Sequence, residues 1–156
     1  MKKNTKFLTE AGVIAALYVV FCLVLRPLSF SAVQVRIAEA LCIMPYFTSA
    51  AVPGLAVGCL LANILGGANI LDIVFGTLAT LIGALGSYFL RKRKYLVSIP
   101  PIIANTLIIP FVLRFAYGEA QPIGLLMATV GIGEVLSAGV LGTGLLLILS
   151  HRNFRG

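Results

Sequence analysis

The sequence predicts an all-α integral membrane protein, a bundle of six transmembrane helices with both termini in the cytoplasm. This fold class follows from the composition, the spacing of the apolar segments and the positions of the basic residues. Hydrophobic residues make up 60% of the chain and charged residues only 11%, and the mean hydropathy is +1.05. Soluble domains carry about 25% charged residues. Most of the surface is therefore expected to face lipid, in a multi-pass protein of the cell membrane.

The chain is predicted to form a single membrane domain over residues 1–156, because its length leaves no room for a soluble domain beside the apolar segments. An N-terminus with Lys2, Lys3 and Lys6 before an apolar stretch is also typical of a signal peptide. The sequence that follows is equally apolar, so cleavage would release no soluble protein. We therefore interpret the first apolar stretch as a retained span.

Six apolar segments are separated by polar turns, basic clusters or prolines. They are expected at about residues 9–25, 36–50, 54–65, 71–90, 97–116 and 122–150. A helix needs about 20 residues to cross the hydrocarbon core. The second and third segments are shorter than this, so we expect them to be tilted, broken, or placed in a thinner region.

The basic residues predict the topology. They form three clusters: Lys2, Lys3 and Lys6; Arg91 to Lys94; Arg152 and Arg155. An even number of spans separates each cluster from the next, so all three are expected on one side, which the positive-inside rule makes the cytoplasm. The connections near residues 29–34, 66–69 and 117–121 then face outward. The net charge of +7 is thereby explained without nucleic acid as a partner.

Polar residues within the apolar segments are the candidate binding residues for a small-molecule substrate. They are Arg36, Glu39, Asn63, Asp72, Asn105 and Glu134. Ionisable groups are costly in lipid unless they face a cavity or a partner. At about 1.5 Å per residue, Asp72 is expected at the outer rim, Glu39 one turn deeper, and Asn105 and Glu134 at one level in the inner half. This descending set predicts a pocket that opens outward, not a continuous pore.

Structural roles remain open for the residues near the outer surface. Arg36 and Glu39 are three positions apart and can pair on one helix face. Asn63 can bond to a neighbouring helix. Asp72 lies near a helix start, where aspartate is a favoured N-cap.

The two deeper residues also have alternatives. Asn105 follows Pro100 and Pro101 and can satisfy a carbonyl that a kink leaves free. Glu134 can make a structural hydrogen bond as a neutral acid. It is nevertheless a lone carboxylate flanked by Gly131 and Gly133, which leave space beside it, so we favour it as the principal binding carboxylate.

Enzyme motifs are absent from the sequence, which predicts no catalytic residues, no metal site and no cofactor. It contains no Gly-x-Ser-x-Gly motif, no pair of histidines and no phosphate-binding loop. The three cysteines, Cys22, Cys42 and Cys59, lie in apolar segments without metal-ligand spacing. They are expected to be free, buried thiols.

Small residues form one face of the first helix. Ala11 and Ala15 are four positions apart, with Gly12 and Ala16 beside them. Such spacing allows a second helix to pack closely. Packing within the bundle is one interpretation of this face, and the resemblance described below implies the other, a contact with a partner protein.

The chain resembles a known family along its whole length. A six-span membrane protein with Ala11 and Ala15 on a small-residue face is similar to the substrate-binding (S) component of energy-coupling factor (ECF) transporters. Within that group the chain resembles the queuosine-precursor transporter family, QueT. The specific part is Gln34 to Thr80, with Val-Arg-Ile-Ala-Glu-Ala-Leu at 35–41, Gly-Cys-Leu-Leu-Ala-Asn at 58–63 and Asp-Ile-Val-Phe-Gly-Thr-Leu-Ala-Thr at 72–80.

The resemblance implies uptake of a 7-deazaguanine-like base, such as the cyano or aminomethyl precursor of queuosine, or queuine. Glu134 or Glu39 would accept the two adjacent ring donors, since charge-assisted bonds are strong. Asp72 would receive a cationic aminomethyl group, and Phe75 or Phe115 would stack on the ring.

The amides of Asn63 and Asn105 would serve the ring oxygen and nitrogens. The implied partners are an ECF transmembrane coupling subunit and two ATPase subunits, which would supply the energy. Two alternatives remain: an S component for another vitamin-like metabolite, and a small membrane transporter that acts alone.

Overall fold

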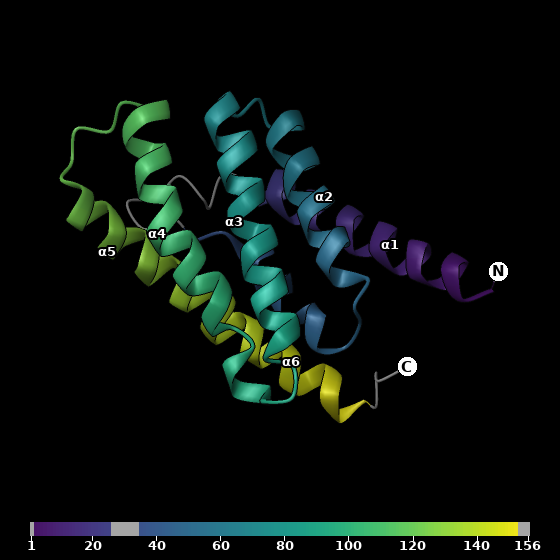
Figure 1. The fold of residues 1–156 in the computed structure, drawn as a ribbon. Helices are drawn as coiled ribbons and strands as arrows, with labels where there is room; N and C mark the ends of the chain where they lie inside the picture. The colour runs from purple at the N-terminus through teal and green to yellow at the C-terminus, as the bar shows by residue number, and fades with distance from the viewer. Residues whose placement is uncertain (1, 26–34, 153–156) are drawn as a thin grey trace.

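The computed structural model describes residues 2–25 and 35–152. The described elements are all helical and contain no strand: α1 (Lys2–Val24), η2 (Ile37–Tyr46), α2 (Ala51–Leu65), α3 (Ile70–Phe89), η3 (Lys94–Leu96), α4 (Ile99–Ala116), α5 (Ile123–Glu134), η4 (Val135–Leu141) and α6 (Gly142–His151). Helices α1 to α5 pack against one another in chain order (Figure 1). The predicted connection at 29–34 and the basic residue Arg155 lie outside the described residues.

The all-α membrane class is confirmed, and each predicted apolar segment contains a helix. Four stretches of the described chain are long and apolar enough to cross a bilayer: Lys3–Val24, Ile70–Phe89, Lys94–Ala116 and Ile123–His151. The other two apolar helices, Ile37–Tyr46 and Ala51–Leu65, are shorter. The structure therefore supports a helical membrane bundle, while the count of six spans stays a prediction.

The second apolar segment differs from the expected short span. Residues Ile37–Tyr46 form a 3₁₀ helix, and most of them are buried. They pack against α1, α3, η4 and α6. Runs of 3₁₀ helix beyond three or four residues are uncommon because their hydrogen-bond geometry is poor. Packing contacts on several sides compensate here for the poor hydrogen-bond geometry. This segment therefore belongs to the core of the bundle and not to its lipid face.

The boundaries of α2 also differ from the prediction. Pro53, which we expected to precede the third segment, lies in the first turn of α2. Proline is tolerated there because its missing N–H would have no intrahelical partner. The expected turn at residues 66–69 is confirmed: Gly67 has φ of 68°, a conformation that glycine adopts without steric cost.

Small residues bring α1 and α2 into close contact. A Cβ added at Gly54 would lie 2.8 Å from the carbonyl oxygen of Ala11, and one at Gly58 would lie 3.0 Å from Cα of Ala15. Real Cβ atoms essentially never show the first distance, and the second is tighter than nine in ten of their contacts. The glycines of α2 therefore fit against the alanine face of α1, as small residues do in membrane bundles.

A second close contact joins α3 to α4. A Cβ at Gly83 would lie 2.7 Å from Cα of Pro101, and one at Gly86 would clash with Cβ of Pro100. The two prolines occupy the first turn of α4, where they cost no hydrogen bond. They pack against the two glycines and bring the end of α3 close to the start of α4.

The last apolar segment is one helical stretch interrupted by a π turn. Helix α5 ends at Glu134, the π-helical residues Val135–Leu141 follow directly, and α6 continues to His151. The hydroxyl of Ser137 donates to the carbonyl of Gly133 at 2.8 Å. Such π turns are rare and often occur at functional sites. The prediction of a single segment is confirmed, but the π turn beside Glu134 was not expected.

Side-chain contacts between distant segments agree with the predicted topology. The ammonium of Lys94 donates to the hydroxyl of Ser150 at 2.8 Å, so two of the basic clusters lie at one end of the bundle. At the other end, the amide of Asn69 donates to the carbonyl of Ala116 at 3.2 Å. The side of the membrane that each end faces stays a prediction.

Candidate functional site

A buried group of polar side chains lies where α1, η2, α4 and α5 meet. Its centre is Glu39 on the 3₁₀ helix. Oε1 of Glu39 accepts a hydrogen bond from the hydroxyl of Tyr18 at 2.5 Å. Oε2 accepts from the thiol of Cys42 at 2.9 Å and from the Nδ2 amide of Asn105 at 3.4 Å. The side chain of Asn105 also lies near that of Glu134. We call these five residues the inner group.

The polar side chains of the inner group are almost completely buried, so each of them needs a hydrogen-bond partner. Tyr18 and Glu39 are each 1% exposed, Asn105 is 3% and Glu134 is 4%. Oε2 of Glu134 has no hydrogen-bond partner among the described residues. A buried acceptor without a partner costs about 1–3 kcal/mol, and more if it is charged. The group therefore contains one buried carboxylate oxygen that makes no hydrogen bond within the described part of the chain.

A second polar group lies near the start of α3 and the end of α4. The guanidinium of Arg36 is 3.8 Å from Oδ2 of Asp72. The same oxygen accepts from the hydroxyl of Tyr117 at 2.9 Å, and the backbone N–H of Asn69 donates to that hydroxyl at 3.2 Å. Partial burial of the Tyr117 hydroxyl and its bond to Asp72 raise the pKa of Tyr117, so at neutral pH it remains a donor. We call Arg36, Asp72 and Tyr117 the rim group.

The other oxygen of Asp72, Oδ1, is buried without a hydrogen-bond partner in the described chain. A Cβ added at Gly76 would lie only 2.9 Å from it, so a glycine at this position allows the Asp72 side chain to lie against α3. Asn63 lies close by and donates to the backbone carbonyl of Asp72 at 3.2 Å. Its amide thus links α2 to α3, in agreement with the structural alternative for this residue.

The structure overturns three of the structural alternatives. Arg36 forms its ion pair with Asp72 and not with Glu39. The N-cap of α3 is Asn69, whose side chain accepts from the N–H of Leu71 at 3.0 Å, so Asp72 is not the cap. Asn105 donates to a carboxylate and not to a carbonyl freed by the prolines.

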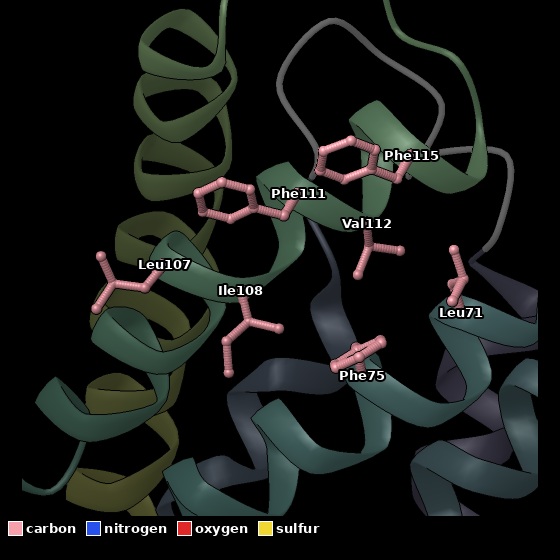
Figure 2. Close-up of a pocket in the computed structure, with 7 residues that line it drawn as sticks. All are labelled: Leu71, Phe75, Leu107, Ile108, Phe111, Val112 and Phe115. Carbon is pink, nitrogen blue, oxygen red and sulfur yellow. The ribbon is translucent and has the colours of Figure 1, made fainter.

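A separate apolar cavity of about 460 Å³ lies between α3 and α4 (Figure 2). Leu71 and Phe75 of α3 line it together with five residues of α4: Leu107, Ile108, Phe111, Val112 and Phe115. The two aromatic residues predicted to stack on a ligand, Phe75 and Phe115, thus lie in one cavity. None of its lining residues belongs to the inner group or the rim group.

The comparison with protein families decides the classification. The QueT transporter family matches residues 8–151, nearly the whole chain. The chain belongs to the QueT transporter family. Comparisons with curated proteins and with solved structures found no match. Together with the four long apolar helices, the family makes this chain a multi-pass transporter of the cell membrane.

The sequence had given no reason to assign a role to two residues of this QueT transporter, Tyr18 and Cys42. Tyr18 lies three positions after Ala15 and continues its helix face, and Cys42 lies one turn after Glu39. These spacings were available as signals. A tyrosine or a thiol in an apolar helix is ordinarily a core residue, however, so neither stood out before the contacts with Glu39 were known.

The small-residue face of α1 in the QueT transporter is partly covered. Ala15 is 7% exposed and packs against Gly58 of α2, while Ala11 is half-buried beside Gly54. Their neighbours Gly12 and Ala16 are exposed, and a Cβ at Gly12 would meet nothing within 4 Å. The outward part of this face is therefore formed by Gly12 and Ala16.

Proposed function

We propose that this QueT transporter is the substrate-binding (S) component of an ECF transporter and captures a queuosine precursor from outside the cell. The ligand would be a 7-deazaguanine, such as the cyano or aminomethyl precursor, or queuine. The whole chain, residues 1–156, would act as one membrane domain. An ECF transmembrane coupling subunit and two ATPase subunits would supply the energy, since the sequence contains no phosphate-binding loop.

The proposal rests on one observation, the unpartnered Oε2 of buried Glu134 beside Asn105. A guanine-type ring has a ring N–H and an exocyclic amine side by side, and an acceptor oxygen nearby. A carboxylate takes such donors in strong, charge-assisted hydrogen bonds. An amide has both donors and an acceptor and can serve the oxygen or the ring nitrogens. Glu134, Glu39 and Asn105 thus provide the chemistry that this ring needs.

The rim group would bind the aminomethyl substituent that one of these ligands carries on its ring. Oδ1 of Asp72 has no hydrogen-bond partner in the described chain. A cationic aminomethyl group would satisfy this oxygen. Arg36 would help to hold the Asp72 side chain in place through their ion pair. Asn63, bonded to the backbone of Asp72, would help to keep this end of α3 in place.

The partner contact is proposed for the α1 face that contains Ala11 and Ala15. Because α2 covers Ala15, the coupling subunit would approach beside it, over exposed Gly12 and Ala16. Small side chains there would let the partner helix come close.

A binding screen tests the proposal. Purified protein would be titrated calorimetrically, and followed by thermal shift, with purines, 7-deazaguanines and vitamins. We expect selective binding of 7-deazaguanines. Selective binding of a vitamin would favour an S component for another metabolite. Uptake by the chain alone in vesicles, without any ATPase, would favour a transporter that acts by itself.

A further inference from the structure

Tyr18 is the member of the inner group that comes from α1. It is 1% exposed, and its hydroxyl donates to Oε1 of Glu39 at 2.5 Å. A buried tyrosine hydroxyl normally needs such a partner. Gly58 of α2 makes room for the residue, because a Cβ at position 58 would lie 2.8 Å from Cβ of Tyr18. The ring is thus held between α2 and the 3₁₀ helix.

The bonds to Glu39 leave little freedom in the carboxylate. An ionised carboxylate offers about four lone-pair sites. Tyr18 occupies one site on Oε1, and Cys42 and Asn105 occupy those of Oε2. One acceptor site therefore remains, on the oxygen that Tyr18 holds. Rotation of the carboxylate would break contacts to two other helices, α1 and α4.

We propose that Tyr18 is a positioning residue that sets the ligand selectivity of this site. The inference rests on the proposed function. A ring with two adjacent donors needs two acceptors at fixed positions: one is Oε2 of Glu134 and the other is the remaining site of Glu39. The Tyr18 hydroxyl fixes the second acceptor. The site then favours a ring that carries the exocyclic amine over the same ring without it.

A pair of ligands and a pair of tyrosine variants test the role of Tyr18. The probes are 7-deazaguanine and 7-deazahypoxanthine, which lacks the exocyclic amine. We expect wild-type protein to prefer 7-deazaguanine by about tenfold or more, the factor that about 1.4 kcal/mol provides. Tyr18→Phe removes only the hydroxyl and should reduce this preference to about twofold or less. Tyr95→Phe is the control, since Tyr95 is 69% exposed in η3, and should keep the wild-type preference.

A glycine pair provides a second measurement that does not depend on the folding of Tyr18→Phe. Gly58→Ala would push on Tyr18, whereas Gly54→Ala would strain the same α1–α2 interface at Ala11, also with a 2.8 Å contact. We expect only Gly58→Ala to reduce the preference for 7-deazaguanine. An equal loss of affinity for both probes in Tyr18→Phe, or equal preferences in the two glycine variants, would overturn the inference. Wild-type protein that binds neither probe would overturn the proposed function, and this inference with it.

Discussion

The Nδ2 amide of Asn105 donates to Oε2 of Glu39 at 3.4 Å, across a separation of 66 positions in the chain. This contact joins α4 to the buried 3₁₀ helix. It holds the amide beside Glu134, whose Oε2 has no hydrogen-bond partner in the described part of the chain. The polar centre of the protein therefore consists of one carboxylate that is already bonded and one that retains a free acceptor.

Glu134→Gln is expected to weaken binding of a 7-deazaguanine by at least about tenfold. The substitution keeps the shape but replaces one acceptor oxygen with a donor, which would face the donors of the ring and leave a buried group unpaired. Calorimetric titration of the purified variant measures the effect. Glu119→Gln, at an exposed position between α4 and α5, is the matched control. Unchanged affinity would remove Glu134 from the site, and loss of folded protein would favour its structural role.

Asp72→Asn is expected to lower the affinity for a cationic ligand more than the affinity for a neutral one. The variant should lose about tenfold or more in affinity for the cationic aminomethyl precursor, because a neutral amide no longer attracts its ammonium group. The neutral cyano precursor should be affected much less. The ratio of the two affinities is the readout. Equal losses for both ligands would contradict a role of Asp72 in receiving the substituent.

Gly83→Ala is expected to destabilise the bundle by about 1–3 kcal/mol, as overpacking does. Its Cβ would lie 2.7 Å from Cα of Pro101, and backbone atoms cannot easily move aside. Thermal unfolding in detergent measures the change. Gly144→Ala in α6 is the control, because a Cβ there meets nothing within 4 Å, and it should be neutral or slightly stabilising. Equal melting temperatures would show that α3 and α4 do not depend on this contact.

Gly12→Leu is expected to block assembly with the coupling subunit and transport, while ligand binding remains intact. The position is open in the bundle, so the added side chain would obstruct only an approaching helix. Co-purification of the partner subunits measures assembly. Ala15→Leu is the comparison, because Ala15 packs against Gly58 and its replacement should lower thermal stability as well. Normal assembly of Gly12→Leu would restrict the small-residue face to packing within the bundle.

Lys92→Cys is expected to resist labelling by a membrane-impermeant thiol reagent added outside intact cells. The Arg91–Lys94 cluster should be cytoplasmic by the positive-inside rule. Glu119→Cys, in a connection expected to face outward, should be labelled under the same conditions. The unsubstituted chain gives the background from the three native cysteines. Strong labelling at position 92 would mean that the predicted topology is wrong.

The lipid environment explains how much of the fold was predictable. Spans in hydrocarbon must be apolar and must satisfy their own backbone hydrogen bonds, so apolar length and basic flanks predict helices directly. The helices at Ile70–Phe89 and Ile99–Ala116 accordingly begin and end within two residues of the predicted bounds. The 3₁₀ conformation of Ile37–Tyr46 was not predictable, because an apolar run has the same composition whether it faces lipid or other helices.

The sequence by itself determined the membrane class, the family and the set of polar residues too costly to leave in lipid. Only the tertiary structure decided how those residues combine. It paired Arg36 with Asp72 and placed Asn105 against Glu39. It also added Tyr18, from a helix in which the sequence had indicated no residue of the polar site. The physical reason is that the cost of placing a polar residue in lipid depends only on that residue and on the segment that contains it. Its hydrogen-bond partners depend on how separate helices pack.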